Sequence, residues 1–94
     1  MTAIPSLDSR IRINDDVLWQ QLQGEAVLLN LKTGVYFGLD AIGTRVWELL
    51  AEHRMVRDVV DAIVGEYDVA AQTCAEDVIA LVADMQKHAL VTVT

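Results

Sequence analysis

The stretch VLLNLKTGVYFGLD, residues 27–40, decides the fold because it reads as two apolar strands joined by a tight turn. Residues 25–31 (EAVLLNL) form a nearly continuous apolar run, which is typical of a strand inside a sheet. Gly34 is free to adopt the positive φ that a tight turn requires. Residues 35–39 (VYFGL) are rich in β-branched and aromatic side chains, which favour a pleated surface. This hairpin holds no nucleophile, no histidine and no pair of metal ligands.

The segment before the hairpin is also extended. Residues 10–13 (RIRI) alternate charged and apolar side chains, the period of a half-buried strand. Residues 17–22 (VLWQQL) form a further short extended segment before Gly24. Residues 1–9 are expected to be a flexible tail. Because 94 residues is the length of one domain, residues 10–94 are expected to form a single domain.

The chain changes to a helical period after Asp40, which is a good N-cap. Apolar side chains then recur three or four residues apart, as in helices that bury one face. The helical stretches cover residues 41–52, 55–67 and 71–88, and residues 90–93 form a last extended segment. The fold class is therefore α+β: a small winged-helix-like domain with a three-stranded antiparallel sheet followed by three helices.

The charge, the cysteine content and the length of the apolar runs exclude several classes of function and location. Fourteen acidic against seven basic residues give a formal charge of −7, whereas nucleic-acid binding depends on clustered Lys and Arg. The single cysteine, Cys74, excludes an internal disulfide and suits a reducing compartment. No apolar run approaches the roughly 20 residues that span a bilayer, and the N-terminus lacks signal-peptide features. We therefore expect a cytoplasmic protein that binds neither nucleic acid nor membrane.

The reactive residues do not form a catalytic or metal-binding pattern. Cys74 and His88 lie on one predicted helix at a separation of about 20 Å along its axis, so they cannot act as a pair. His53 and His88 share no acidic residue at a helical repeat, which makes a metal site improbable. The glycines of the hairpin are spaced too widely for a dinucleotide loop. The sequence therefore predicts no enzyme and no cofactor.

Binding is the function that remains. A strand at the edge of a sheet offers unpaired N–H and C=O groups to a strand of another chain. Residues 35–39 are the candidate edge, where Gly38 lets a second backbone approach closely. The third predicted helix carries more apolar positions than one core face needs, so it can wall a groove. The predicted peptide-binding residues are Val35, Tyr36, Phe37, Gly38, Leu39, Asp77, Val78, Leu81 and Met85.

The residues LLNLKTGVYFGLDAIGTRVWELL (28–50) resemble the core of the PqqD-like family, the recognition elements for precursors of ribosomally made peptide natural products. The matching positions are Leu29–Asn30, Gly34, Tyr36, Leu39–Asp40, Gly43, Val46–Trp47 and Leu49–Leu50, with Tyr67–Asp68–Val69, Asp77–Val78, Leu81 and Leu90–Val91 further on. The chain differs from many relatives at Ala70–Ala71 and at Met55, where helix-capping residues are usual.

The resemblance implies that the protein binds the leader of a precursor peptide as an added strand and presents it to maturation enzymes. It is most similar to the stand-alone leader-binding proteins of lasso-peptide clusters, which implies a leader peptidase, and possibly a cyclase, as partners. Two other interpretations remain open. One is a winged-helix DNA-binding regulator, and the other is an oligomeric subunit, such as a homodimer, whose apolar surface is an interface without a peptide ligand.

Overall fold

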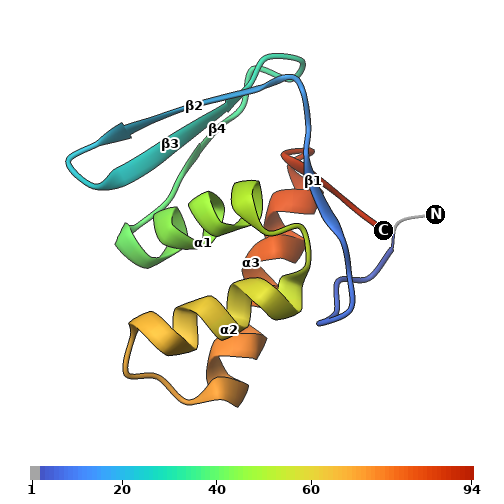
Figure 1. The fold of residues 1–94 in the computed structure, drawn as a ribbon. Coiled ribbons are helices and arrows are strands. Elements are labelled where there is room, and N and C mark those ends of the chain that lie inside the picture. Colours follow the sequence, from blue (N-terminus) through green and yellow to red (C-terminus); the bar gives the residue numbers. More distant parts are fainter. Residues whose placement is uncertain (1–2) are drawn as a thin grey trace.

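The computed structural model describes residues 3–94. Figure 1 shows a small sheet lying over the first of three helices, with a separate pair of short strands beside them. The elements in chain order are β1 (Ile11–Ile13), β2 (Val17–Leu22), β3 (Glu25–Asn30), β4 (Tyr36–Gly38), α1 (Ala41–Glu52), α2 (Val56–Glu66), α3 (Ala71–Lys87) and β5 (Val91–Val93).

The main sheet is antiparallel with the order β2-β3-β4. Gln23 and Gly24 join β2 to β3 with φ values of 55° and 82°, the backbone of a two-residue hairpin turn. Gly34, with φ 74°, turns the chain from β3 into β4. The predicted three-stranded antiparallel sheet followed by three helices is confirmed.

The strand formed by residues 10–13 does not belong to the three-stranded sheet. Residues 10–13 do form a strand, but β1 pairs with β5 at the other end of the chain, with Ile11 opposite Val93. The sequence pattern shows the alternation of this strand and cannot show its partner. The main sheet instead takes the 17–22 segment as its third strand, so that β3 is central and β4 lies at an edge.

The core lies between the inner face of the sheet and the three helices. Trp47 on α1 and Leu28 on β3 are fully buried, and α2 and α3 contribute one apolar stripe each. The Thr44 hydroxyl accepts a hydrogen bond from the Ala26 N–H at 2.7 Å, which fixes α1 against β3. The other buried apolar side chains on the helices are those of Val46, Leu49, Leu50, Val56, Val59, Val60, Ile63, Cys74, Val78, Val82 and Met85.

The residue type before each helix determines whether its N-terminus has a side-chain cap. The Asp40 carboxylate accepts a hydrogen bond from the Gly43 N–H at 2.7 Å and so caps α1. Met55 and Ala70 precede α2 and α3 without any side-chain cap. Neither position carries the Ser, Thr, Asp or Asn that usually caps a helix.

Part of the segment predicted to be a flexible tail packs on the domain. Met1 and Thr2 lie outside the described residues, but Ser9 is buried and its carbonyl accepts a hydrogen bond from the Val56 N–H. The Leu7 carbonyl accepts from the Arg57 N–H, and Asp8 pairs with the Arg57 side chain at 2.7 Å. The prediction of a tail reaching residue 9 is therefore too long. Over residues 3–94, none of the helices has the length and apolar character needed to cross a bilayer.

Candidate functional site

Strand β4 has a free edge. The Val35 carbonyl accepts a hydrogen bond from Asn30, and the Leu39 N–H donates to Ala26, so these two residues face β3. Backbone groups alternate in direction along a strand, which turns the N–H and C=O of Tyr36 and Gly38 away from β3. Within residues 3–94 no hydrogen bond to these outward groups is present. The edge therefore offers two donors and two acceptors to another strand.

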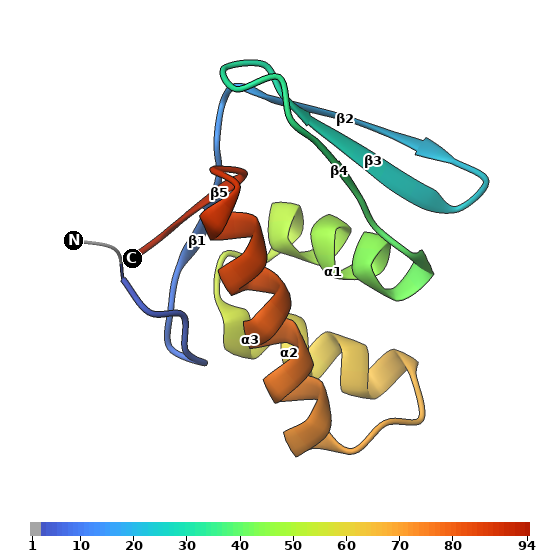
Figure 2. The same ribbon diagram turned by 180° about the vertical axis from the view of Figure 1, so that it is seen from behind.

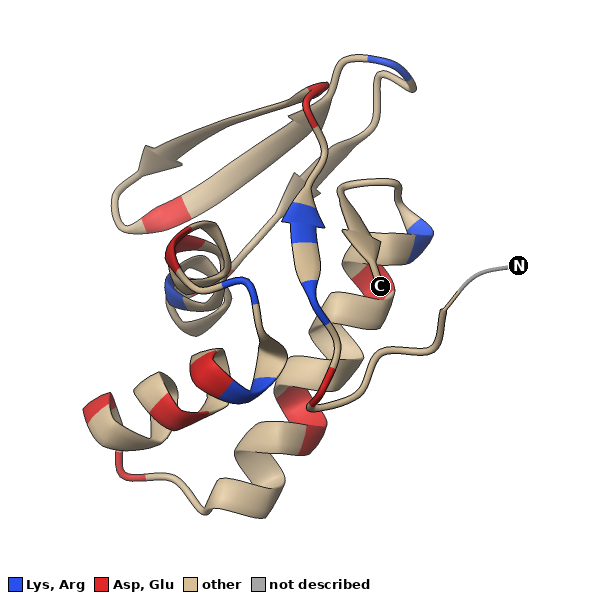
Figure 3. Ribbon diagram, turned by 45° about the vertical axis from the view of Figure 1, so that its right-hand side comes forward, with Lys and Arg blue, Asp and Glu red and all other residues tan. Residues whose placement is uncertain are grey.

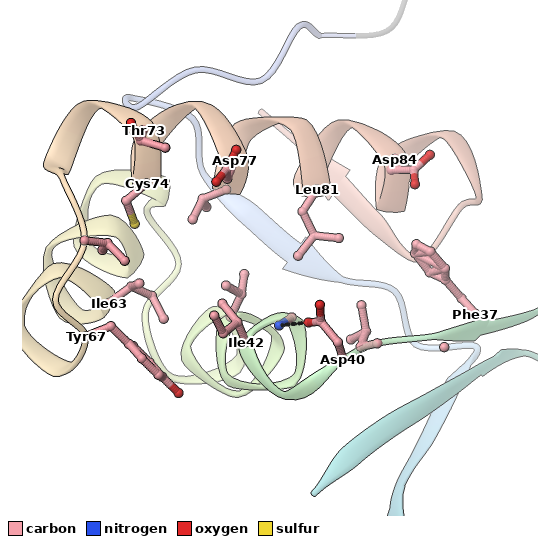
Figure 4. Close-up of a pocket in the computed structure, with 16 residues that line it drawn as sticks. Phe37, Asp40, Ile42, Ile63, Tyr67, Thr73, Cys74, Asp77, Leu81 and Asp84 are labelled. Atoms are coloured by element: carbon pink, nitrogen blue, oxygen red, sulfur yellow. Dashed lines mark hydrogen bonds between the residues drawn. The ribbon is translucent and has the colours of Figure 1, made fainter.

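A groove of about 510 Å³ lies beside this edge. Figure 2 shows β4 descending to the start of α1, with α3 running past it from the end of α2 toward the sheet. Figure 4 shows the Leu81 side chain of α3 pointing across this space toward Asp40 and Ile42. The lining residues are Phe37, Gly38, Leu39, Asp40, Ile42, Gly43, Val46, Ile63, Tyr67, Val69, Thr73, Cys74, Asp77, Val78, Leu81 and Asp84.

The groove is apolar at its floor and acidic at its rim. Leu39 and Val78 are buried beneath it, whereas Leu81 is half-buried and Ile42 is 49 % exposed. An exposed isoleucine beside a half-buried leucine is an apolar surface from which a ligand can exclude water. Asp40, Asp77 and Asp84 supply the charged groups along the rim.

An aromatic pair lies at one end of the groove. Phe37 stacks on His88 with ring centroids 5.2 Å apart and 16° between the planes. The His88 ring nitrogen Nδ1 lies 2.8 Å from the Asp84 carbonyl oxygen, which holds the imidazole against the last turn of α3. The pair fixes the Phe37 ring at the point where β4 meets α3.

Cys74 is the most nucleophilic residue type in the groove, but its environment disfavours reaction. Its side chain is buried, and burial together with the charge of Asp77 raises the pKa of the thiol above its usual value. A raised pKa lowers the fraction of reactive thiolate. Among the described residues there is also no group of three side chains able to hold a metal ion. Burial and the charge of Asp77 therefore disfavour Cys74 as a nucleophile.

The structure brings six of the nine predicted site residues to the groove: Phe37, Gly38, Leu39, Asp77, Val78 and Leu81. Tyr36 lies on the outer face of the sheet and is 70 % exposed, and Val35 lies outside the groove at the turn. Met85 has to be corrected: it is fully buried in the core and does not form part of the wall. The role of the six residues as peptide contacts stays a prediction.

Sequence reasoning also missed several lining residues. Ile42 shares the helical stripe of α1 with core residues, but its place in the first turn leaves it in the groove. Tyr67 and Val69 come from the end of α2 and the following loop, where no periodicity predicts an orientation. Asp84 lies seven residues after Asp77, so a search for acidic residues at two-turn spacing on α3 would have found it.

The fold and the groove together define a small α+β domain with an open sheet edge beside a helix-lined groove. The chain belongs to the PqqD family: the family model described as coenzyme PQQ synthesis protein D (PqqD) matches residues 25–91. The resemblance that the sequence predicted is thereby confirmed. No curated protein matches the chain.

Two solved structures resemble this one. The structure of TbiB1 in complex with the TbiA(beta) leader peptide has 40 % sequence identity and a TM-score of 0.81, covering 85 % of this chain and 93 % of that chain. The structure of a lasso peptide synthetase B1 complexed with the leader peptide has 22 % identity and a TM-score of 0.79, covering 87 % and 96 %. The second likeness concerns the fold alone.

Proposed function

We propose that this protein binds the leader segment of a ribosomally synthesised precursor peptide without catalysing a reaction on it. The leader adds as a strand to the free edge of β4, and residues 35–39 form the pairing strand. Asp77, Val78 and Leu81 on α3 form the opposite wall. The observation that carries this proposal is the unpaired β4 edge lying directly beside an apolar groove. The complex of TbiB1 with its leader peptide supports it.

The groove has a suitable length for an extended segment. Thr73 and Asp84 mark its ends along α3, and eleven residues at 1.5 Å each span about 17 Å. An extended chain rises about 3.3 Å per residue, so about five residues fit along this wall. The paired part at β4 is shorter, because only Tyr36 and Gly38 direct backbone groups outward.

The energies are sufficient for binding in this mode. Four backbone hydrogen bonds contribute about 2–6 kcal/mol in total, which only offsets the 2–5 kcal/mol or so needed to order a flexible peptide. Each apolar anchor buried over Leu81 or Ile42 adds about 1.5–3 kcal/mol. Side chains seated in the groove therefore determine both the affinity and the choice of peptide.

We further propose that the bound leader is presented to a leader peptidase, and possibly a cyclase, of lasso-peptide biosynthesis. The precursor is made on the ribosome, so this encounter belongs in the cytoplasm. Residues 10–94 act as one leader-binding domain.

A homodimer that covers the β4 edge is the alternative use of this surface. Light scattering distinguishes the homodimer from a leader-binding monomer. The dimer keeps its dimeric mass when leader peptide is added, whereas the mass of the monomer increases only by that of the bound peptide.

DNA binding is the weaker alternative. Arg10 and Arg54 are brought close together, since the Ile11 N–H donates to the Arg54 carbonyl, and Figure 3 shows basic residues near this point. Arg57 nearby is paired with Asp8, and the charges of Asp58 and Asp61 also act on it. The positive charge of Arg10, Arg54 and Arg57 is therefore partly neutralised. The formal charge of −7 on the whole chain also disfavours DNA binding.

Fluorescence anisotropy tests the proposal. The probes are the labelled TbiA(beta) leader peptide and labelled leaders of any short precursor genes that neighbour the gene of this protein. We expect saturable binding with Kd of about 10 μM or lower. Failure of every probe to bind at about 50 μM protein, with the protein folded by circular dichroism, overturns the proposed function.

A further inference from the structure

The charged groups that line the groove are all of one sign. Asp40, Asp77 and Asp84 line it, and no Lys, Arg or His belongs to the lining. Within residues 3–94 no basic side chain lies within ion-pair distance of Asp40 or Asp77. The described acidic groups do not form a metal site either. The groove thus combines an apolar floor with two carboxylates, those of Asp40 and Asp77, that lack a cationic partner, whereas the Asp84 carboxylate lies 3.9 Å from Nδ1 of His88.

Occupation of the groove changes the surroundings of these carboxylates. A peptide chain that covers Leu81 also removes water from Asp77, which lies one helical turn before it on the same face of α3. Loss of water from an unpaired carboxylate opposes binding, and a positive charge placed next to it offsets that loss. A negative charge at the same place adds repulsion. The groove therefore discriminates between peptides by their charge as well as by their apolar residues.

Resting on the proposed function, we propose that the groove selects a cationic leader segment: a Lys or Arg lies against Asp77, next to an apolar residue seated over Leu81. Asp77 and Asp84 are seven residues apart, or about 10 Å along α3. That distance equals about three residues of extended chain. A second basic residue about three positions from the first therefore meets Asp84 near the aromatic end of the groove.

Selection from a displayed library of random 12-residue peptides tests this specificity. Three immobilised proteins are compared: the wild type, Asp77→Lys and Glu76→Lys. Glu76 is exposed on α3 and does not line the groove, so its variant has the same net charge as Asp77→Lys with an unaltered groove. We expect the wild type and Glu76→Lys to enrich Lys or Arg at one or two positions beside an apolar residue, and Asp77→Lys to lose or invert this preference.

Affinities of single peptides complete the test. In an enriched peptide, replacing the basic residue by Glu is expected to raise Kd for the wild type about threefold to tenfold, and Asp77→Lys is expected to bind the Glu peptide better than the wild type does. Asp77→Asn, which removes charge without adding bulk, serves if Asp77→Lys fails to fold. Enriched peptides without a basic preference, or the same preference in Asp77→Asn, overturn this inference while leaving the proposed function intact. No enriched peptide on any protein contradicts the proposed function itself.

Discussion

Replacing Gly38 by proline tests strand addition by removing a single backbone N–H donor from the edge of β4. The Gly38 N–H points away from β3, so proline at this position breaks no hydrogen bond of the sheet. Edge strands tolerate proline for this reason. Phe37 before it is already extended, which is the conformation that proline imposes on its neighbour. The variant is therefore expected to fold, with a melting temperature within about 5 °C of the wild type.

The loss of affinity follows from the geometry of the edge. Tyr36 and Gly38 offer four outward backbone groups, each able to contribute about 0.5–1.5 kcal/mol. Proline removes one donor, and its ring occupies the space where the added backbone must lie. We expect a loss of about 1.4–2.8 kcal/mol, which raises Kd for the leader about tenfold to a hundredfold.

Anisotropy with the labelled TbiA(beta) leader peptide measures this change. Gly38→Ala is the matched control, because it keeps the N–H and its new Cβ meets no atom within 4 Å. The alanine variant keeps the N–H donor and is therefore expected to raise Kd for the leader less than the proline variant does. A folded Gly38→Pro protein that binds the leader with wild-type affinity refutes pairing at β4.

Three further predictions concern the groove and the core. Leu81→Lys places a charge on the groove wall and is expected to raise Kd for the leader by about tenfold or more, measured by the same anisotropy assay; unchanged affinity removes Leu81 from the site. Met85→Ala empties a fully buried position and is expected to lower the free energy of unfolding in urea by about 2–5 kcal/mol, whereas a loss below about 1 kcal/mol contradicts its place in the core. Cys74 is expected to react with a thiol reagent at pH 8 much more slowly in the folded than in the unfolded protein, because it is buried and its pKa is raised; equal rates contradict this.

The sequence predicts the strands and helices well because the spacing of apolar residues changes to a helical period at Asp40 and returns to an extended one at residues 90–93. It could not predict that β1 pairs with β5, since alternation in residues 10–13 describes one face of a strand and not its partner. Nor does the spacing distinguish Ile42, which lies in the groove, from Val46 and Leu49 in the core. Both kinds of position occupy the same helical stripe, and only the packing of other elements against it determines which of them stays uncovered.

Three of the five predicted residues on the edge strand and three of the four on α3 line the groove, and their role as peptide contacts stays a prediction. Phe37 and Leu39 lie on the same face of the extended segment 35–39, and both line the groove. Met85 was placed on the wall because it extends the apolar stripe of Val78 and Leu81, but the helix turns this position fully into the core. His88 was considered only as a catalytic or metal-binding residue, and its stacking on Phe37 depends on a contact between distant segments.

Amide hydrogen exchange, followed by NMR with and without the TbiA(beta) leader peptide, tests pairing at β4 most directly. The bound leader should slow exchange of the Tyr36 and Gly38 amides strongly. The Phe37 amide, which faces β3 in both states, should change little. Unaltered exchange at Tyr36 and Gly38 in a saturated complex, or new protection confined to β2 at the opposite edge, would contradict the account.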